Sequence, residues 1–273
     1  MMKRLLFVLL VFAAPLHAQT NPDWHRAIPG FKIAGNLYYV GTADLAVYLI
    51  ATPQGNVLIN SDFPEDVPTI RKSIEQLGFK YADTKILLSS HAHGDHDAAT
   101  SIVQKETGAR VMVMDGDVAE VESTRPGRPG ARVDRVLHDG DTVMLGGSTL
   151  TAHLTPGHTQ GCTTWTTDTT ENGKRLQVAF VCSVTINEGV HLVGNTRVPS
   201  IADHYARAFR ILRDLRPDVF VAEHGGVFGL EEKAQRAGAD GAANPFVDRE
   251  GYRQFVERSE RAYLTQLRAE QRK

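Results

Sequence analysis

A cluster of histidines near residue 91 constrains this chain more than any other feature of its sequence. His91, His93, Asp95 and His96 fall within six residues, directly after the apolar strand signal at residues 85–89. Crowded imidazoles suppress one another's protonation unless a cation organises them. Imidazole combined with a carboxylate suits zinc and its first-row neighbours rather than calcium or magnesium. The cluster therefore predicts a transition-metal site at the end of a strand; the alternative is a solvated histidine-rich loop that binds metal only adventitiously.

Two further histidines occupy similar positions at the ends of expected strands. His158 lies in a Thr-Pro-Gly-His-Thr turn between two strand signals, and His224 follows the last strand signal at residues 218–222. Strand ends of a sandwich gather along one rim, so we expect both histidines to join the metal site. Five others lack this context and are expected to be structural or on the surface. They are His25, His138, His153, His191 and His204.

Strand and helix signals alternate along the chain and predict a single α/β (α+β) domain. Strands are expected at residues 37–40, 46–51, 56–60, 85–89, 110–114, 141–145, 149–154, 162–167, 176–182 and 218–222. Helices are expected at residues 67–77, 98–106, 201–215 and 252–267, where apolar residues recur at helical spacing. No Gly/Ser linker or internal repeat divides the chain, so we expect two β-sheets packed face to face with helices outside. Residues 19–35 are expected to form a loosely ordered lead-in, and residues 123–130 an exposed loop.

Residues 1–18 resemble a cleaved secretory signal peptide. Lys3 and Arg4 precede an apolar run of about 11 residues, and Ala18 stands at the expected cleavage site. The run is shorter than the ~20 residues of a membrane-spanning helix, although an uncleaved anchor is the alternative. We therefore expect residues 19–273 to form one domain in the periplasm, free of the membrane. Thirty Lys and Arg against 32 Asp and Glu give a net charge of −2, which predicts no nucleic-acid-binding surface.

The chain has two cysteines, too few for a disulfide scaffold or a cysteine-rich zinc module. Cys162 and Cys182 lie in consecutive strand signals, and antiparallel pairing of these strands would bring them within disulfide range. Two buried free thiols are the alternative. Export to an oxidising compartment favours the disulfide.

The histidine pattern as a whole resembles the signature of the metallo-β-lactamase superfamily. The matching residues are the run His-Ala-His-Gly-Asp-His at residues 91–96, His158 in its Pro-Gly-His-Thr turn, and His224. The resemblance implies a four-layer αββα sandwich with two Zn²⁺ ions at one edge. It assigns His91, His93 and His158 to the first zinc, and Asp95, His96 and His224 to the second. A water or hydroxide would bridge the two ions, and Asp95 would orient it.

Residues 178–185 indicate which members of the superfamily the chain resembles most. Many thioesterases, lactonases and phosphodiesterases of the superfamily carry a metal-bridging aspartate there, and this chain reads Val-Ala-Phe-Val-Cys-Ser with no aspartate. Cys182 is not expected to be a zinc ligand, because the subclass that uses a cysteine has arginine where this chain has His96. Residues 157–165, 182–185 and 244–246 resemble the third subclass of class B β-lactamases, which implies that Ser183 and Thr185 hold the substrate carboxylate. Glu223 is unusual beside a metal ligand, and strand alternation predicts that it points away from the rim.

These observations predict a zinc-dependent β-lactamase that hydrolyses the ring amide of penicillins, cephalosporins and carbapenems, an activity that confers antibiotic resistance. No serine acyl-enzyme is expected, because neither a Gly-x-Ser-x-Gly nor a Ser-x-x-Lys motif is present. A monomer with a small-molecule substrate is the expected state. One alternative is an exported metallo-hydrolase of the same fold that acts on a lactone or thioester. The other is a periplasmic zinc-binding protein without catalysis.

Overall fold

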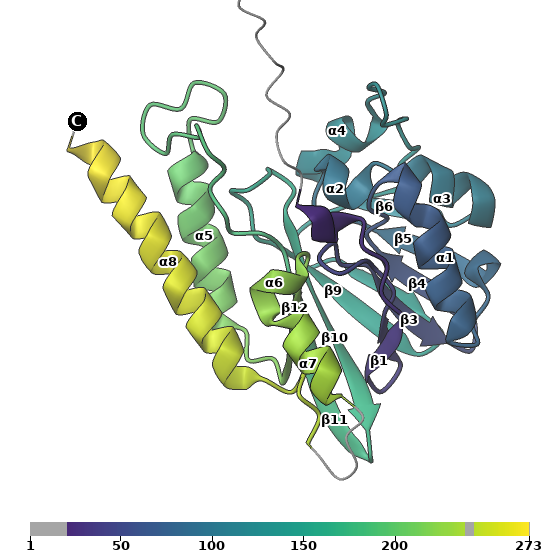
Figure 1. Ribbon diagram of the computed structural model, residues 1–273. Helices are drawn as coiled ribbons and strands as arrows, with labels where there is room; N and C mark the ends of the chain where they lie inside the picture. The colour runs from purple at the N-terminus through teal and green to yellow at the C-terminus, as the bar shows by residue number, and fades with distance from the viewer. Residues whose placement is uncertain (1–20, 238–242, 273) are drawn as a thin grey trace, which may run out of the picture.

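The computed structural model describes residues 21–237 and 243–272 and contains two β-sheets (Figure 1). The first has seven strands, paired in the order in which they occur along the chain. They are β1 (Phe31–Ala34), β2 (Leu37–Tyr39), β3 (Tyr48–Thr52), β4 (Gly55–Ile59), β5 (Thr84–Leu88), β6 (Arg110–Met114) and β7 (Arg135–Leu137). Strands β1 to β4 form an antiparallel meander, and β4 to β7 are parallel. The parallel half directs the carboxyl ends of its strands to one edge of the sheet.

The second sheet has five strands in the order β12-β11-β10-β9-β8. They are β8 (Thr142–Leu145), β9 (Ser148–Leu154), β10 (Thr163–Glu171), β11 (Lys174–Val181) and β12 (Val219–Ala222). Strands β8 to β11 pair antiparallel, whereas β12 runs parallel to β11. As a result, β11 and β12 end side by side.

Helices cover the outer face of each sheet, which confirms the expected αββα sandwich (Figure 1). The seven-stranded sheet is covered by α1 (Val67–Gln76), α3 (Thr100–Thr107) and α4 (Val118–Glu122). The five-stranded sheet is covered by α5 (Ile201–Asp214), α6 (Gly225–Phe228), α7 (Leu230–Arg236) and α8 (Arg249–Gln271). One further α-helix, α2 (Gly94–Asp97), and the 3-10 helices Pro22–Trp24, Pro64–Asp66, Tyr81–Asp83 and Asp115–Asp117 lie in the connections. Within the described ranges, no helix combines the length and apolar character needed to cross a membrane.

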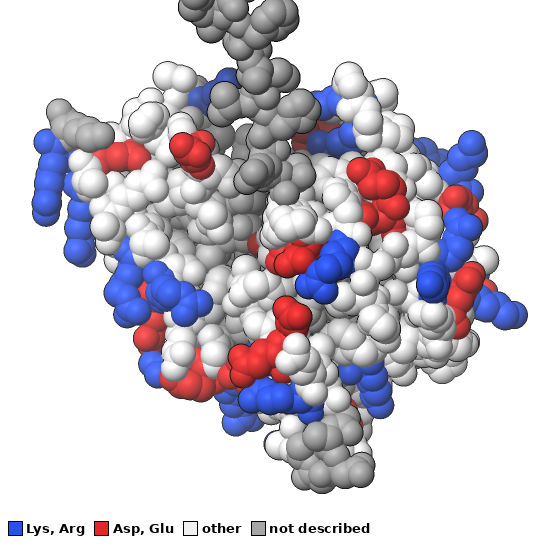
Figure 2. Space-filling view, in the orientation of Figure 1, with Lys and Arg blue, Asp and Glu red and all other residues white. Residues whose placement is uncertain are grey.

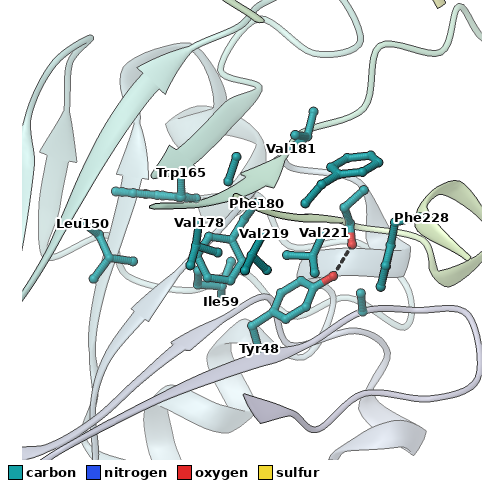
Figure 3. Close-up of a cluster of buried hydrophobic side chains, with 14 of the residues drawn as sticks. Tyr48, Ile59, Leu150, Trp165, Val178, Phe180, Val181, Val219, Val221 and Phe228 are labelled. Atoms are coloured by element: carbon teal, nitrogen blue, oxygen red, sulfur yellow. Dashed lines mark hydrogen bonds between the residues drawn. The ribbon is translucent and has the colours of Figure 1, made fainter. Parts of the chain in front are cut away.

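Large side chains from both sheets meet in the core (Figure 3). The ring of Tyr48 from β3 lies 5.1 Å from that of Phe180 in β11, measured between centroids. The Tyr48 hydroxyl donates to the Ala222 carbonyl at the end of β12. The Trp165 indole N–H of β10 donates to the Ser89 carbonyl at 3.1 Å. These bonds hold the ends of β5 and β12, which carry the histidines, at a common edge of the sandwich.

The N-terminal segment is more ordered than the sequence predicted. Instead of a loose lead-in over residues 19–35, the described part forms a 3-10 helix at Pro22–Trp24 and the edge strand β1. Phe31 stacks on Tyr39 and on Phe246, with ring centroids 5.4 and 5.6 Å apart. The prediction was wrong because a four-residue strand shows too little alternation, and its packing partners are distant in sequence. The expected signal peptide, residues 1–18, lies outside the described residues.

The expected exposed loop at residues 123–130 also needs a correction. Most of it is exposed, but Arg128 is only 9% exposed. Its guanidinium forms ion pairs with Asp97, directly after the histidine cluster, and with Glu120 in α4. The prediction failed here because composition identifies a loop but does not reveal a single arginine that turns inward to a buried carboxylate.

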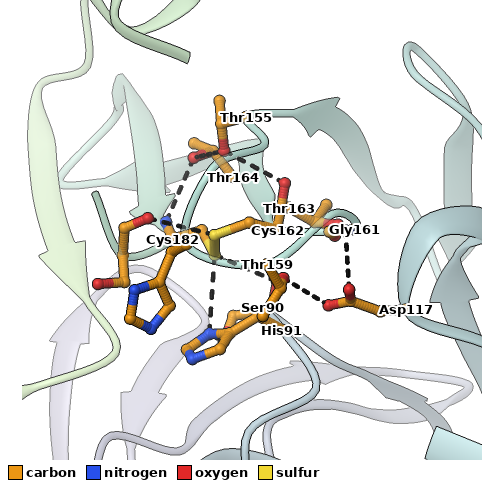
Figure 4. The surroundings of a disulfide bond; sticks show 12 residues. Ser90, His91, Asp117, Thr155, Thr159, Gly161, Cys162, Thr163, Thr164 and Cys182 are labelled. Carbon is orange, nitrogen blue, oxygen red and sulfur yellow. Dashed lines mark hydrogen bonds between the residues drawn. A yellow bond between two sulfur atoms is a disulfide. The ribbon is translucent and has the colours of Figure 1, made fainter. Parts of the chain in front are cut away.

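The expected disulfide between Cys162 and Cys182 is confirmed (Figure 4). Cys162 directly precedes β10 and Cys182 directly follows β11, and their Cα atoms are 5.9 Å apart. Both residues are fully buried. The Cys182 sulfur lies 3.7 Å from Nδ1 of His91. With both sulfurs joined, neither cysteine is available as a zinc ligand, as the sequence predicted for Cys182.

Replacing both cysteines with serine is expected to lower the free energy of unfolding by about 3 kcal/mol, because opening a loop of this length restores chain entropy to the unfolded state. Urea denaturation of the oxidised protein and of the Cys162→Ser, Cys182→Ser variant measures the difference. A reductant should destabilise the wild-type protein by a similar amount and leave the double variant unchanged. Two reactive thiols in the denatured, unreduced protein would contradict the assignment.

Candidate metal centre

All six expected ligands lie at one edge of the sandwich. His91 and His93 follow β5, and Asp95 and His96 stand in the short helix α2 that comes next. His158 occupies the turn between β9 and β10, and His224 follows β12. The structure therefore brings together residues that the sequence places as far as 133 positions apart, since 224 − 91 = 133.

His91, His93 and His158 form the first group. Their ring centroids are 4.7 to 4.8 Å apart in every pairing. Nδ1 of His93 and Nε2 of His158 approach to 3.1 Å, and one nitrogen from each ring lies within 4.8 Å of the others. Three ring nitrogens this close are spaced as the ligands of a single metal ion would be.

Asp95, His96 and His224 form the second group. One carboxylate oxygen of Asp95 lies 3.3 Å from Nε2 of His96 and 3.5 Å from Nε2 of His224. The rings of His96 and His224 have centroids 4.9 Å apart. His91 also lies within 4.8 Å of Asp95 and His96, measured between potential ligand atoms. The two groups are thus adjacent, with His91 between them.

The buried histidines have ring nitrogens that no protein group satisfies. Nε2 of His91 and both ring nitrogens of His96 are inaccessible to solvent and have no hydrogen-bond partner among the described residues. Burial, followed by the neighbouring histidines, holds the pKa of His91 well below its ordinary value, and burial lowers the pKa of His96 to about 3. The rings are therefore neutral and offer lone pairs. Leaving such nitrogens unpaired is costly, and a zinc ion would satisfy them.

Carboxylates make the second group the more negatively charged of the two. Burial would lower the pKa of His224, but its hydrogen bonds to Asp44 and Asp95 outweigh burial and raise the pKa to about 10. Burial likewise opposes ionisation of Asp95, yet His224 and His96 hold its pKa well below the usual range. Two carboxylates thus favour positive charge at this position. A metal cation would take the place of the proton on His224.

Two partners that orient the ligands were not found from the sequence. An oxygen of Asp44 lies 3.0 Å from Nδ1 of His224, and the Thr185 carbonyl lies 2.7 Å from Nδ1 of His158. Each fixes the ring with Nε2 towards the site, as second-layer partners of metal ligands do. Asp44 stands in a turn of the N-terminal meander, and nothing in the sequence connects it with residue 224.

Asp117 joins two loops that carry candidate ligands, a role that was not found from the sequence. Its carboxylate accepts hydrogen bonds from the Ala92 N–H at 2.9 Å, the Thr159 hydroxyl at 2.7 Å and the Gly161 N–H at 2.7 Å. The first bond holds the loop of His91 and His93, and the other two, shown in Figure 4, hold the segment around His158. The available signal was its position just beyond the predicted strand at residues 110–114.

Ser183, Thr185 and Glu223 lie next to the candidate ligands. Ser183 is buried and its hydroxyl accepts a hydrogen bond from the Thr185 N–H at 3.2 Å, whereas Thr185 is exposed. The Glu223 side chain is 4% exposed and lies against Ser183, and burial raises its pKa to about 7. It therefore points into the interior rather than into open solvent at the rim.

A cavity of about 490 Å³ opens beside the first group. His93 and His158 form part of its wall. Tyr205, Arg125 and Arg197 also line it. The first group therefore has an open side with room for a small molecule, unlike the closed coordination of a structural zinc site.

Comparison with known proteins agrees with this geometry. The family model described as "Metallo-beta-lactamase superfamily" matches residues 45–224, and the chain belongs to this superfamily. Its structural neighbours include subclass B3 enzymes, so the predicted family, fold and metallo-β-lactamase class are confirmed.

Three solved structures illustrate the similarity. The FEZ-1 metallo-β-lactamase from Legionella gormanii is 46% identical, with a TM-score of 0.87 over 90% of this chain and 98% of that one. The subclass B3 enzyme BJP-1 from Bradyrhizobium japonicum is 34% identical, with a TM-score of 0.85 over 92% and 97%. The class B3 di-zinc enzyme LRA-12 from an Alaskan soil metagenome is 34% identical, with a TM-score of 0.83 over 91% and 97%.

Curated relatives match a smaller part of the chain. A hydroxyacylglutathione hydrolase from Rhodopseudomonas palustris (strain BisB5) is 31% identical over 112 residues, which cover 41% of this chain. The match spans 39% of that relative's length.

Proposed function

We propose that the protein is a zinc-dependent β-lactamase that hydrolyses the ring amide of β-lactams. The observation that carries this proposal is the two adjacent groups of three ligands in a chain 46% identical to FEZ-1 over 90% of its length. The unsatisfied buried nitrogens of His91 and His96 fit zinc, and LRA-12 is described as a di-zinc enzyme.

His91, His93 and His158 would hold one Zn²⁺, and Asp95, His96 and His224 the other. When bound, the two ions would lower the pKa of a shared water and polarise the β-lactam carbonyl. The Asp95 carboxylate orients the attacking water by accepting its hydrogen bond. Asp44 and the Thr185 carbonyl keep the rings of His224 and His158 in the ligating orientation.

Ser183 and Thr185 would bind the substrate carboxylate beside the ring. The Ser183 oxygen accepts from the Thr185 N–H, and its hydroxyl proton, which has Glu223 beside it, would turn to the anion. Thr185 is exposed just beyond β11. Its carbonyl bonds to His158, which lines the neighbouring cavity. The two hydroxyls and the metal ions would together position the ring amide for attack.

A lactonase or thioesterase of the same fold is the second candidate, and similarity to hydroxyacylglutathione hydrolases favours it. Against it, β11 is followed by Cys182, which is disulfide-bonded to Cys162, and by Ser183. Neither position holds an aspartate. A zinc protein without catalysis would not need the open cavity beside His93 and His158.

The proposal includes export to the periplasm with removal of residues 1–18, and a monomer that binds no nucleic acid. Support for the last point comes from the surface. Lys and Arg side chains are interspersed with Asp and Glu side chains on the face shown in Figure 2. Such a face lacks the broad positive potential that attracts a nucleic-acid backbone.

The deciding experiment is turnover by the purified chain lacking residues 1–18, loaded with zinc, on three substrates: a carbapenem, an acyl-homoserine lactone and a glutathione thioester. We expect carbapenem hydrolysis that is lost with a chelator and restored with zinc. Turnover of the lactone or the thioester, without carbapenem turnover, would replace the proposal with the second candidate. A folded protein with two zinc ions and no turnover of any substrate would contradict both.

A further inference from the structure

The Thr185 carbonyl accepts two hydrogen bonds, one from a turn and one from a helix. His158 donates to it from Nδ1 at 2.7 Å, and the hydroxyl of Tyr205, from helix α5, donates to it at 2.9 Å. A carbonyl oxygen has two lone pairs, so these donors together satisfy it completely. Tyr205 is therefore connected, through one oxygen atom, to a candidate zinc ligand.

The segment that carries this carbonyl makes few hydrogen bonds, although its neighbours Val184 and Ile186 pack on the core. Thr185 lies beyond the end of β11 and is exposed. Among the described residues, its N–H bonds only to the Ser183 hydroxyl, at 3.2 Å. Two hydrogen bonds hold the Thr185 oxygen, and without the Tyr205 hydroxyl only the one from His158 would remain.

Tyr205 also supports the turn that carries His158. Gly157 has a φ of +140°, and a Cβ at this position would lie 2.8 Å from the Tyr205 ring. The ring therefore packs directly on the Gly157 backbone, one residue before the ligand. Tyr205 is 1% exposed, and its ring stacks on Tyr263 of α8 with centroids 5.8 Å apart. The Tyr205 ring, which belongs to α5 and stacks on α8, thus packs against the turn that carries His158.

We propose that Tyr205 is a positioning residue for both the first zinc site and the substrate-binding segment, acting through the Thr185 carbonyl. The inference rests on the proposed function in assigning His158 to zinc and Thr185 to the substrate carboxylate. It adds a physical link between the two, because a movement of the shared carbonyl alters the His158 ring and the Thr185 backbone together. Helix α5 thereby becomes part of the site, although it supplies no candidate metal ligand.

The test is Tyr205→Phe, which removes the hydroxyl and keeps the ring. Direct second-layer partners of zinc ligands change affinity or activity by 10- to 100-fold, so one step further away we expect about 3- to 10-fold weaker zinc binding at one of the two sites. Competition with a chromophoric chelator measures this on the full zinc-loaded protein. At saturating zinc, KM for a carbapenem should rise by about 3-fold or more, with a smaller change in kcat.

Tyr263→Phe is the matched control. It removes a hydroxyl bonded to a backbone carbonyl, that of Ala202 at 2.9 Å, from the ring stacked on Tyr205. We expect wild-type zinc affinity and KM from this variant. Equal effects of the two substitutions, or wild-type zinc affinity and KM in Tyr205→Phe, would overturn the inference. The zinc titration needs no substrate, so an absence of β-lactam turnover in the wild-type protein would refute the proposed function and leave this comparison decisive.

Discussion

Replacing His224 with alanine is expected to reduce the zinc content from two ions to one and to lower carbapenem turnover by about 100-fold or more. His224 is one of three ligands expected to hold the second ion, and Asp95 and His96 alone would hold it only weakly. In the wild-type protein the His224 ring lies between two carboxylates, with Nδ1 3.0 Å from Asp44 and Nε2 3.5 Å from Asp95. The variant leaves both carboxylates without this partner. Metal analysis of the dialysed protein, together with steady-state kinetics, measures both effects.

His153→Ala is the control for this experiment. His153 lies on β9 and is not among the candidate ligands, and its Nε2 pairs with the Thr166 hydroxyl at 2.8 Å. Losing that bond is expected to affect stability modestly, by about 1 kcal/mol, and to leave two zinc ions bound. Undiminished turnover by His224→Ala with one zinc bound would show that the second group is not required for catalysis.

The candidate ligands could be located from the sequence because their signals are local. His91, His93, Asp95 and His96 are adjacent in sequence, and His158 and His224 each follow a clear strand signal. The ends of these strands meet at one edge of the sandwich whichever way the intervening loops run. Approximate strand boundaries were therefore sufficient to place the six residues together. The same reasoning found the two sheets, the long helices and the pairing of Cys162 with Cys182.

The supporting residues could not be predicted because their roles exist only in three dimensions. Asp44 reaches His224 across 180 positions, and Tyr205 reaches Thr185 from a helix whose spacing indicated only a buried face. A carboxylate in a turn and a tyrosine on an apolar stripe are ordinary in sequence. What distinguishes them is the atom each one bonds to, which depends on how the second sheet docks on the first.

The role of Arg128 in stability could not be predicted from the sequence either. Replacing Arg128 with methionine is expected to lower the free energy of unfolding by about 3–5 kcal/mol at neutral pH. Its side chain is 10% exposed and that of its partner Asp97 is 1% exposed. One Asp97 oxygen already lacks a hydrogen-bond partner within the described part of the chain. Removing the guanidinium would leave this carboxylate buried without its counter-charge, while methionine keeps most of the apolar volume.

Arg132→Met, in the same loop region, is the control for Arg128→Met, because Arg132 is 80% exposed in its pair with Asp134. An exposed pair contributes about 0–1 kcal/mol, so we expect little change in urea denaturation. A loss for Arg128→Met no larger than that for Arg132→Met would show that the buried pair is not required.

The Arg128→Met deficit should also depend on pH, with a sign that identifies its cause. Burial raises the pKa of Asp97 to about 7, although Arg128 opposes the rise. The folded protein therefore holds this proton more tightly than the unfolded chain, and the contribution of Asp97 to stability falls as pH increases from about 4 towards 7. Without Arg128 the pKa rises further and the fall continues to higher pH. The deficit relative to wild type should thus be larger at pH 8 than at pH 5, and Asp97→Asn in the same background should recover part of it. A deficit that is equal at both pH values would instead indicate lost packing around the methionine.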